Sequence, residues 1–326
     1  MSTSQTHQKD ISKRRPPYRI REIAQQAGLS PATVDRVLHE RPGVRASTVA
    51  EVHRAIADLG RQRTQLRLGG RTFLVDLVMV APARFTSAVR HALEAELPTL
   101  RPAAIRSRFW LREAGTPADV ARVLDDIARR GSAGVILKAP DDPTVNDAIA
   151  RLADSGVATV TLVTDLPASR RVAYVGMDNR AAGATAAYLL TAVTGFAPGT
   201  VLVTISRSMF RGEEEREMGF RAALRTLAPH RSIHEITDTD GLDATLRAAV
   251  AGALERDPAI DSVYSIGGGN TATLDAFDAA GRVPRAYLAH DLDDDNVALL
   301  RQGRLTAVLH HDLRFDMRQA CRLLLQ

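Results

Sequence analysis

Short apolar stripes separated by polar turns run through the first sixty residues. The positions that repeat at the spacing of one helical turn are Ile20, Ile23, Ala24 and Ala27. Gly28 then ends this helix, since glycine readily takes the positive φ that the turn requires. Ser30 and Pro31 begin a second helix, because a hydroxyl caps the first free N–H groups and proline fits the first helical position.

The second helix has a buried face made by Val34, Val37 and Leu38, and a third helix follows. Its apolar positions are Val49, Val52, Ile56 and Leu59. Two short helices joined by a glycine-containing turn, with a supporting third, predict a helix-turn-helix domain. The exposed face of the second helix is small and polar at its N-terminal end, as entry into a DNA major groove requires. The alternative is a three-helix scaffold without a ligand.

From residue 73 onward, apolar strands alternate with amphipathic helices. The predicted strands are 73–80, 104–109, 134–138, 157–163, 172–176, 200–205, 261–266, 285–290 and 305–310. This alternation predicts a doubly wound α/β fold with parallel sheets. A segment of about 250 residues suggests two such lobes rather than one. Ligands of these folds bind at the carboxyl ends of the strands.

The distribution of charge separates the two parts of the chain. Residues 1–72 hold fourteen Lys and Arg against six Asp and Glu, a formal charge of +8, whereas the remainder holds 29 against 32, or −3. A basic end on a mildly acidic body indicates a nucleic-acid-binding module. A basic tail that merely adds solubility is the alternative for residues 1–17, which we expect to form a disordered arm.

Composition excludes several classes of protein. No run of eighteen apolar residues is present, and the N-terminus lacks the apolar segment of a secretory signal, so we expect a cytoplasmic protein without a membrane partner. The single cysteine, Cys321, excludes an intramolecular disulfide and a cysteine-based zinc site. We expect no cofactor, no metal and no catalytic residues.

The N-terminal pattern is specific enough to suggest a family. The run IREIAQQAGLSPATVDRVLHERPGVRASTVAEVHRAIADLG resembles the DNA-binding domain of the lac repressor family along its full length. The resemblance implies that six residues contact DNA: Ser30, Pro31, Ala32, Thr33, Arg36 and His39. We add Arg19, at the start of the first helix, as a further DNA contact. Arg36 is expected to pair with guanine O6 and N7. Asp35 replaces the family's serine, and either reads a cytosine amino group or is held by Arg36 or Arg19.

The segment 61–72 departs from the family. The family has a Pro-Asn pair and an Ala-Arg-x-Leu helix whose leucine enters the minor groove, whereas this chain has RQRTQLRLGG. Either Leu66 or Leu68 takes that role, or the segment is a flexible basic tether. We therefore expect four parts: an arm over 1–17, a helix-turn-helix domain over 18–60, a hinge linker over 61–72 and a two-lobed ligand-binding and dimerisation domain over 73–326.

The remainder resembles the periplasmic sugar-binding-protein fold that the same family carries. The runs that resemble it are VTLVTDLPAS, VGMDNRAAGATAAYLL, RGEEEREMGF, LAHDLDDDN and LTAVLHHDLRFDMRQA. The implied ligand-binding residues are Phe85, Asp165, Arg216, Asn270, Asp291 and His311. Phe85 would stack on a sugar ring and the charged side chains would bind hydroxyls. The resemblance also implies a further strand after the last helix, which this sequence, ending at Gln326, does not contain.

Structural roles are the alternatives for several of these residues. Asp178 and Asp291 each precede a helix and could cap it. Arg216 lies among four glutamates and could belong to a solvated ion-pair face. Because neighbouring residues of a strand point to opposite faces, only one of His310 and His311 can face a ligand.

Together these features predict a sequence-specific transcriptional repressor whose operator affinity is controlled by a sugar, a polyol or a related metabolite. We expect a homodimer, or a tetramer, on a pseudo-palindromic operator, since one helix-turn-helix makes too few contacts for tight binding. The alternatives are a sugar-binding receptor or an enzyme on the same α/β fold. The loop SIGGGNT could hold a phosphate, but it has neither the G-x-G-x-x-G spacing nor a P-loop lysine.

Overall fold

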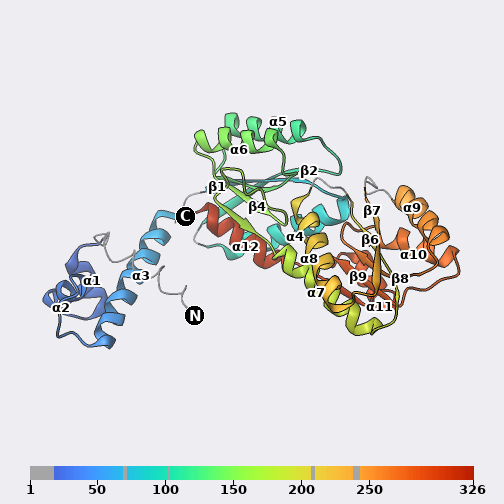
Figure 1. Cartoon of the computed structure of the whole chain (residues 1–326). Helices are drawn as coiled ribbons and strands as arrows, with labels where there is room; N and C mark the ends of the chain where they lie inside the picture. The colour runs from blue at the N-terminus through green and yellow to red at the C-terminus, as the bar shows by residue number, and fades with distance from the viewer. Residues whose placement is uncertain (1–17, 69–71, 102, 207–209, 238–242) are drawn as a thin grey trace. The chain divides into compact units, whose positions relative to one another are not determined.

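The computed structural model describes residues 18–68, 72–101, 103–206, 210–237 and 243–326 (Figure 1). The chain divides into two compact units, Met1–Arg71 with Pro102–Ala104, and Thr72–Arg101 with Ile105–Gln326. The predicted basic arm, 1–17, lies outside the described residues.

The first unit contains three helices, α1 (Ile20–Ala27), α2 (Pro31–Leu38) and α3 (Ala46–Leu68). Gly28 ends α1 with a φ of 67°, and the Ser30 hydroxyl caps α2 by accepting from the Thr33 N–H at 3.1 Å. These features confirm the two predicted helices, the end of the first at Gly28 and the start of the second at Ser30 and Pro31. The buried residues at the centre of the unit are Ile23, Ala24, Val34, Val37, Val52 and Ala55.

The third helix is longer than the sequence pattern predicts. It continues through residues 61–68, which the sequence analysis assigns to the linker. The backbone there is helical. The Leu66 side chain lies outside the described side chains, so its predicted place in the minor groove stays a prediction.

The second unit has two lobes, each built on a five-stranded sheet. The first sheet has the order β2-β1-β3-β4-β5, and its β1–β3, β3–β4 and β4–β5 pairs are parallel. Its strands are β1 (Thr72–Val80), β2 (Ala104–Arg112), β3 (Gly134–Lys138), β4 (Thr159–Leu162) and β5 (Ala173–Val175). One face packs on α4 (Ala83–Glu96) and α12 (Leu313–Leu324), and the other on α5 (Pro117–Arg130) and α6 (Pro143–Asp154). A short 3₁₀ helix, η1 (Leu97–Thr99), follows α4.

The second sheet has the order β10-β9-β8-β6-β7, with parallel neighbours throughout. Its strands are β6 (Gly199–Thr204), β7 (Arg231–Ile236), β8 (Ile260–Ser265), β9 (Ala286–His290) and β10 (Ala307–Leu309). One face packs on α7 (Asn179–Thr194) and α8 (Arg211–Leu227), and the other on α9 (Asp243–Arg256) and α10 (Asn270–Ala279); α11 (Asp294–Arg301) follows β9. This doubly wound arrangement confirms the predicted fold class, although the sequence analysis missed the edge strand β7.

The chain crosses between the lobes twice. It leaves the first lobe between β5 and α7, and it returns between β10 and α12, which packs against α4 and the first sheet (Figure 1). Glu96 of α4 fixes this return, because its buried carboxylate accepts from Arg318 and from Arg314, both at 2.7 Å. The hydrogen bond from Arg318, helped by Arg314, lowers the pKa of Glu96 to about 2, so the carboxylate stays charged.

Helices α7 and α8 pack unusually closely through two glycines. A Cβ atom at Gly183 would overlap the carbonyl oxygen of Arg216, and one at Gly219 would overlap that of Arg180. Both obstacles are backbone atoms of a packed helix, which cannot move aside as a flexible side chain can. The backbone of α8 around Arg216 is therefore held tightly in place.

We predict that Gly183→Ala destabilises the second unit. Alanine favours a helix over glycine, yet the overlap with the α8 backbone costs more, and overpacking of this kind typically costs about 1–3 kcal/mol. Urea unfolding of the variant measures the change in the free energy of unfolding. Gly252→Ala is the control, because a Cβ there meets only the flexible end of Arg256 at 3.4 Å. Equal stability of the two variants would contradict the close packing.

Candidate functional site

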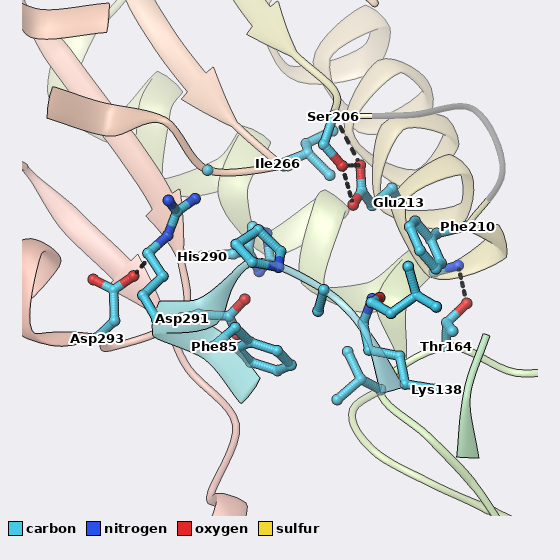
Figure 2. Close-up of a pocket in the computed structure, with 18 of the residues that line it drawn as sticks. Phe85, Lys138, Thr164, Ser206, Phe210, Glu213, Ile266, His290, Asp291 and Asp293 are labelled. Carbon is cyan, nitrogen blue, oxygen red and sulfur yellow. Dashed lines mark hydrogen bonds and ion pairs between the residues drawn. The ribbon is translucent and has the colours of Figure 1, made fainter. Parts of the chain in front are cut away.

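A cavity lies between the carboxyl ends of the two sheets (Figure 2). It encloses about 930 Å³, open solvent at its mouth included. The first lobe contributes residues at or just after the ends of β1, β2, β3 and β4. The second lobe contributes residues at or just after the ends of β6, β8 and β9, and residues at and around the start of α8. This is the edge at which doubly wound sheets bind their ligands.

Two phenylalanines from opposite lobes form apolar walls of the cavity. Phe85 lies in the first turn of α4, and Phe210 is the residue before α8. Both rings are largely buried, and both line the cavity in Figure 2. Aromatic faces pack well against the C–H faces of sugar rings and other apolar ligand surfaces.

Lys138, the last residue of β3, brings a buried ammonium group to the cavity. Its Nζ lies 3.7 Å from the centre of the Phe210 ring, a cation–π contact between the lobes, and donates a long hydrogen bond of 3.4 Å to the carbonyl of Val80. Burial lowers the pKa of Lys138 to about 8, although the charges of Glu213 and Asp291 oppose the shift. The ammonium group therefore has N–H donors left for a ligand.

Asp291 follows β9 and presents an acceptor with no partner. Its Oδ1 is buried and makes no hydrogen bond to the described residues, and its backbone has a φ of 66°. Aspartate tolerates this left-handed region better than most residues, and such conformations recur at functional sites. The predicted alternative, that Asp291 caps the next helix, is wrong: Asp293 is the cap, accepting from the Asn296 N–H at 2.8 Å.

His290 lies beside Asp291 and is held neutral. Its Nε2 is 2.8 Å from the hydroxyl of Tyr264, and its Nδ1 is buried without a partner among the described residues. Burial lowers the pKa of His290 well below its ordinary value, and the positive charge of Arg216 lowers it further. His290 therefore offers the cavity an uncharged nitrogen, a donor or an acceptor according to its tautomer.

Polar contacts join the two lobes around the cavity. Arg84 of α4 forms an ion pair with Asp293 at 3.2 Å, and the Thr164 hydroxyl accepts from the N–H of Gly212 at 3.0 Å. Figure 2 shows both contacts on opposite sides of the space between the lobes. Within the second lobe, Glu213 accepts from the backbone N–H of Ser206 at 3.0 Å and from its hydroxyl at 2.7 Å.

Arg216 lines the cavity from α8, and only 3% of it is exposed. It therefore does not belong to a solvated ion-pair face, the alternative left open by the sequence. Its Nε donates to Oδ1 of Asn179 at 2.8 Å, and its Nη2 lies 3.1 Å from Nε2 of His311. His311 is buried next to Arg216 and is not among the residues that line the cavity. His310 is exposed.

Besides His311, two more of the predicted ligand-binding residues lie away from the cavity lining. The carboxylate of Asp165 pairs with Arg171 and accepts from the Thr161 hydroxyl and the Leu166 N–H, both at 2.8 Å. Asn270 donates to Asn296 at 2.6 Å and accepts from the Tyr287 hydroxyl at 3.0 Å, next to a smaller pocket.

Several polar and aromatic residues of the cavity were not among the predicted ligand-binding residues. They are Arg84, Glu113, Lys138, Thr164, Ser206, Phe210, Glu213, His290, Asp293 and Asn296. Lys138 and Thr164 lie at or just after the carboxyl end of a strand, and this position is a signal that the sequence does contain. Asp178 caps α7, accepting from the Ala181 N–H at 2.9 Å.

The predicted DNA-contacting face of the first unit is exposed. Thr33 is half-buried, and the other residues of this face are exposed: Arg19, Ser30, Pro31, Ala32, Arg36 and His39. No hydrogen bond or ion pair to another described residue occupies the Arg36 guanidinium. Asp35 pairs with Arg41 at 3.1 Å, and its carboxylate lies 3.1 Å from Nδ1 of His39. Of the two alternatives from the sequence, pairing with Arg36 or Arg19 is therefore wrong, and the contact with a cytosine amino group stays a prediction. The pairing with Arg41 offsets the charge of Asp35 within the unit.

A helix-turn-helix unit followed by a two-lobed α/β domain with a polar cavity defines a class of protein, the ligand-responsive transcription regulators. A family model described as "Bacterial regulatory proteins, lacI family" matches residues 19–62, and one described as "Periplasmic binding protein domain" matches residues 78–326. The chain belongs to the lacI family of bacterial regulatory proteins, and its second unit is a periplasmic binding protein domain.

Solved structures share the fold of the second unit at low sequence identity. A glucose-galactose binding protein, GanP from Geobacillus stearothermophilus, is 19% identical with a TM-score of 0.69, over 78% of this chain and 90% of its own. A solute binding protein of an ABC transporter from Burkholderia graminis, in complex with D-arabinose, is 20% identical with a TM-score of 0.70, over 79% and 88%. No curated protein sequence matches the chain.

None of the helices in the described parts of the chain is long and apolar enough to cross a membrane. The described side chains include no group of three or more His, Cys, Asp or Glu placed to hold a metal ion.

We predict that binding of a ligand that accepts from the Lys138 ammonium weakens as the pH rises above about 8. Such a ligand favours the charged form, so its affinity is complete below the pKa of the free protein and is lost as the pH rises through it. Between pH 7 and pH 9 the loss should be about tenfold. Calorimetric titrations across this range measure it. In Lys138→Gln the affinity should be lower at pH 7 and nearly independent of pH; an equally steep profile would assign the titration to another group.

Proposed function

We propose that this regulator is a repressor whose operator affinity is controlled by a sugar or polyol bound in the cavity between the lobes. The observation that carries the proposal is the unpartnered, buried carboxylate oxygen of Asp291 in a cavity that also holds the free donors of Lys138 and two aromatic walls. A hydroxyl group both donates and accepts, so a polyhydroxylated ligand can satisfy Asp291 and Lys138 together. Phe85 and Phe210 supply apolar faces for its carbon skeleton.

Relatives with the same fold support this class of ligand. The structures similar to the second unit include a glucose-galactose binding protein and a protein in complex with D-arabinose. Of the ligand-binding residues expected from the sequence, we retain Phe85, Arg216 and Asp291, which line the cavity, and assign His311 a supporting place next to Arg216. We add Lys138 and Phe210. Asp165 and Asn270 are left out, because protein groups already occupy their polar atoms.

On the DNA side, we propose that α2 enters the major groove with Arg36 as the main base-reading residue. Pairing between Asp35 and Arg41 reduces the repulsion that a carboxylate at this position would exert on phosphates. One such unit contacts a single half-site, so we propose a homodimer on a two-fold-related operator. We also propose that the cavity binds its ligand without turnover, as a sensor rather than an active site.

A thermal-shift screen tests the effector class. Full-length protein is heated with individual neutral aldoses, pentoses and polyols, such as D-glucose, D-galactose, D-arabinose and myo-inositol. A ligand at a hundred times its Kd stabilises the folded protein by about 2.7 kcal/mol, which raises the melting temperature measurably. Absence of any shift across sugars and polyols, together with a shift from an unrelated metabolite class, would overturn the proposed effector.

We predict that Asp291→Ala weakens sugar binding much more than it lowers stability. Truncation leaves a ligand hydroxyl unpaired, which typically reduces affinity about ten- to a hundredfold. Calorimetry measures the affinity and a thermal scan the stability. Asp178→Ala is the matched control, because Asp178 caps α7 and does not line the cavity. The control should melt earlier and bind sugar normally; the same behaviour from Asp291→Ala would remove it from the site.

We predict that Arg36→Ala weakens operator binding by about 1–3 kcal/mol and relaxes base preference at one position in each half-site. Mobility shifts against a set of single-base operator variants measure both effects. Arg54→Ala, which removes an exposed charge from α3, is the control and should weaken binding to all sequences alike. An unchanged base preference in Arg36→Ala would show that another side chain reads that position.

A further inference from the structure

Arg216 contacts both segments where the chain crosses between the lobes. Its Nε donates at 2.8 Å to Asn179, the first residue of α7 after the first crossover. Its Nη2 lies 3.1 Å from Nε2 of His311, which belongs to the second crossover between β10 and α12. One guanidinium group therefore joins the cavity to both connections between the lobes.

The contacts continue from these two residues into the first lobe. The Asn179 amide donates to the Val163 carbonyl and to the Tyr174 hydroxyl, each at 3.1 Å. On the other side, Nδ1 of His311 lies 3.4 Å from Oδ2 of Asp316, a buried residue of α12, and neither atom has a hydrogen-bond partner among the described residues. A guanidinium can only donate, so His311 accepts at Nε2 and carries its proton on Nδ1, facing the Asp316 carboxylate.

The charge of Arg216 is stabilised by neutral groups. No carboxylate of the described residues lies within ion-pair distance of it, and its two polar partners are an amide oxygen and an uncharged imidazole. A buried cation without a paired anion is costly, so its hydrogen bonds are sensitive to what else it contacts. The close packing at Gly183 fixes its backbone, so a new bond to its side chain acts on Asn179 and His311 rather than moving α8.

We propose that Asn179, His311 and Asp316 are positioning residues that, through Arg216, transmit occupation of the cavity to the two crossover segments. The proposal rests on the proposed function, because it takes Arg216 to contact the effector. A hydroxyl that accepts from Arg216 redistributes its donors, and the hydrogen bonds to the two crossovers adjust together. Buried polar networks suit this purpose, since their members are satisfied in few discrete arrangements.

Asp316→Asn tests this transmission through Arg216, which we call the relay, with the least disturbance of packing. The full-length variant is compared with wild type in two measurements, made with D-glucose, D-galactose, D-arabinose and myo-inositol as probes. Calorimetry gives the Kd of each sugar without DNA, and fluorescence anisotropy gives the operator Kd with and without saturating sugar. If these residues transmit occupation of the cavity, the variant should bind sugar with a Kd within about threefold of wild type. Its response to sugar, measured as the factor by which saturating sugar changes the operator Kd, should be at least about fivefold smaller than in wild type. Asp312→Asn, which keeps a side-chain oxygen to cap α12, is the matched control and should leave this factor unchanged.

A measurement that needs no sugar accompanies these. Spin labels placed on α5 and α9, one in each lobe, report the distribution of distances between the lobes. Asn179→Ala and Asp316→Asn should each broaden or shift it, whereas Asp312→Asn should not. Unchanged distances and an unchanged response of the operator Kd to sugar would overturn the relay. If none of the four sugars bound wild type, the proposed function would lose its support, and the distance distribution alone would decide whether these residues position the lobes.

Discussion

The guanidinium of Arg216 is buried where the cavity meets both crossovers, and it donates to one neutral acceptor on each of them. This arrangement depends on the glycines that let α7 and α8 touch, because any side chain at Gly183 would push Arg216 away from Asn179. The position of Arg216 therefore links the cavity, the two crossovers and the packing of the second lobe. A sensor needs such a link, because a ligand can shift a conformational equilibrium only through contacts that differ between the states of the protein.

The rest of the cavity is arranged around groups that the protein leaves partly unsatisfied. Asp291 has a buried oxygen without a partner, His290 has a free nitrogen, and Lys138 lies on an aromatic face instead of beside a carboxylate. Each of these costs folding free energy, and a ligand that supplies the missing hydrogen bonds recovers part of that cost. A cavity of this kind favours a ligand dense in hydroxyls, since each hydroxyl serves a donor and an acceptor at once.

The sequence predicts the helices and strands whose residue pattern is local. It does not predict the role of a residue when that role depends on contacts with distant parts of the chain. Runs of Val, Ile and Leu revealed the central strands, whereas the edge strand β7 mixes charged and apolar residues in RSIHEI and was missed. Phe85, Arg216 and Asp291 were placed on the cavity by their positions after strands and by family resemblance. Asp165 has the same kind of position, but its pairing with Arg171, six residues along the chain, satisfies it elsewhere. No local pattern shows that Phe210 comes to lie over Lys138, because the two residues belong to different lobes.

The central claim is that filling the cavity changes the affinity for DNA. The most direct test is a titration of the labelled operator with full-length protein at fixed salt, with and without a saturating concentration of a sugar that calorimetry shows to bind. The account predicts that the operator Kd changes at least about fivefold, and that Asp291→Ala shifts the sugar concentration needed for this change upwards by about ten- to a hundredfold. An operator Kd that stays the same while the sugar is bound would contradict the account.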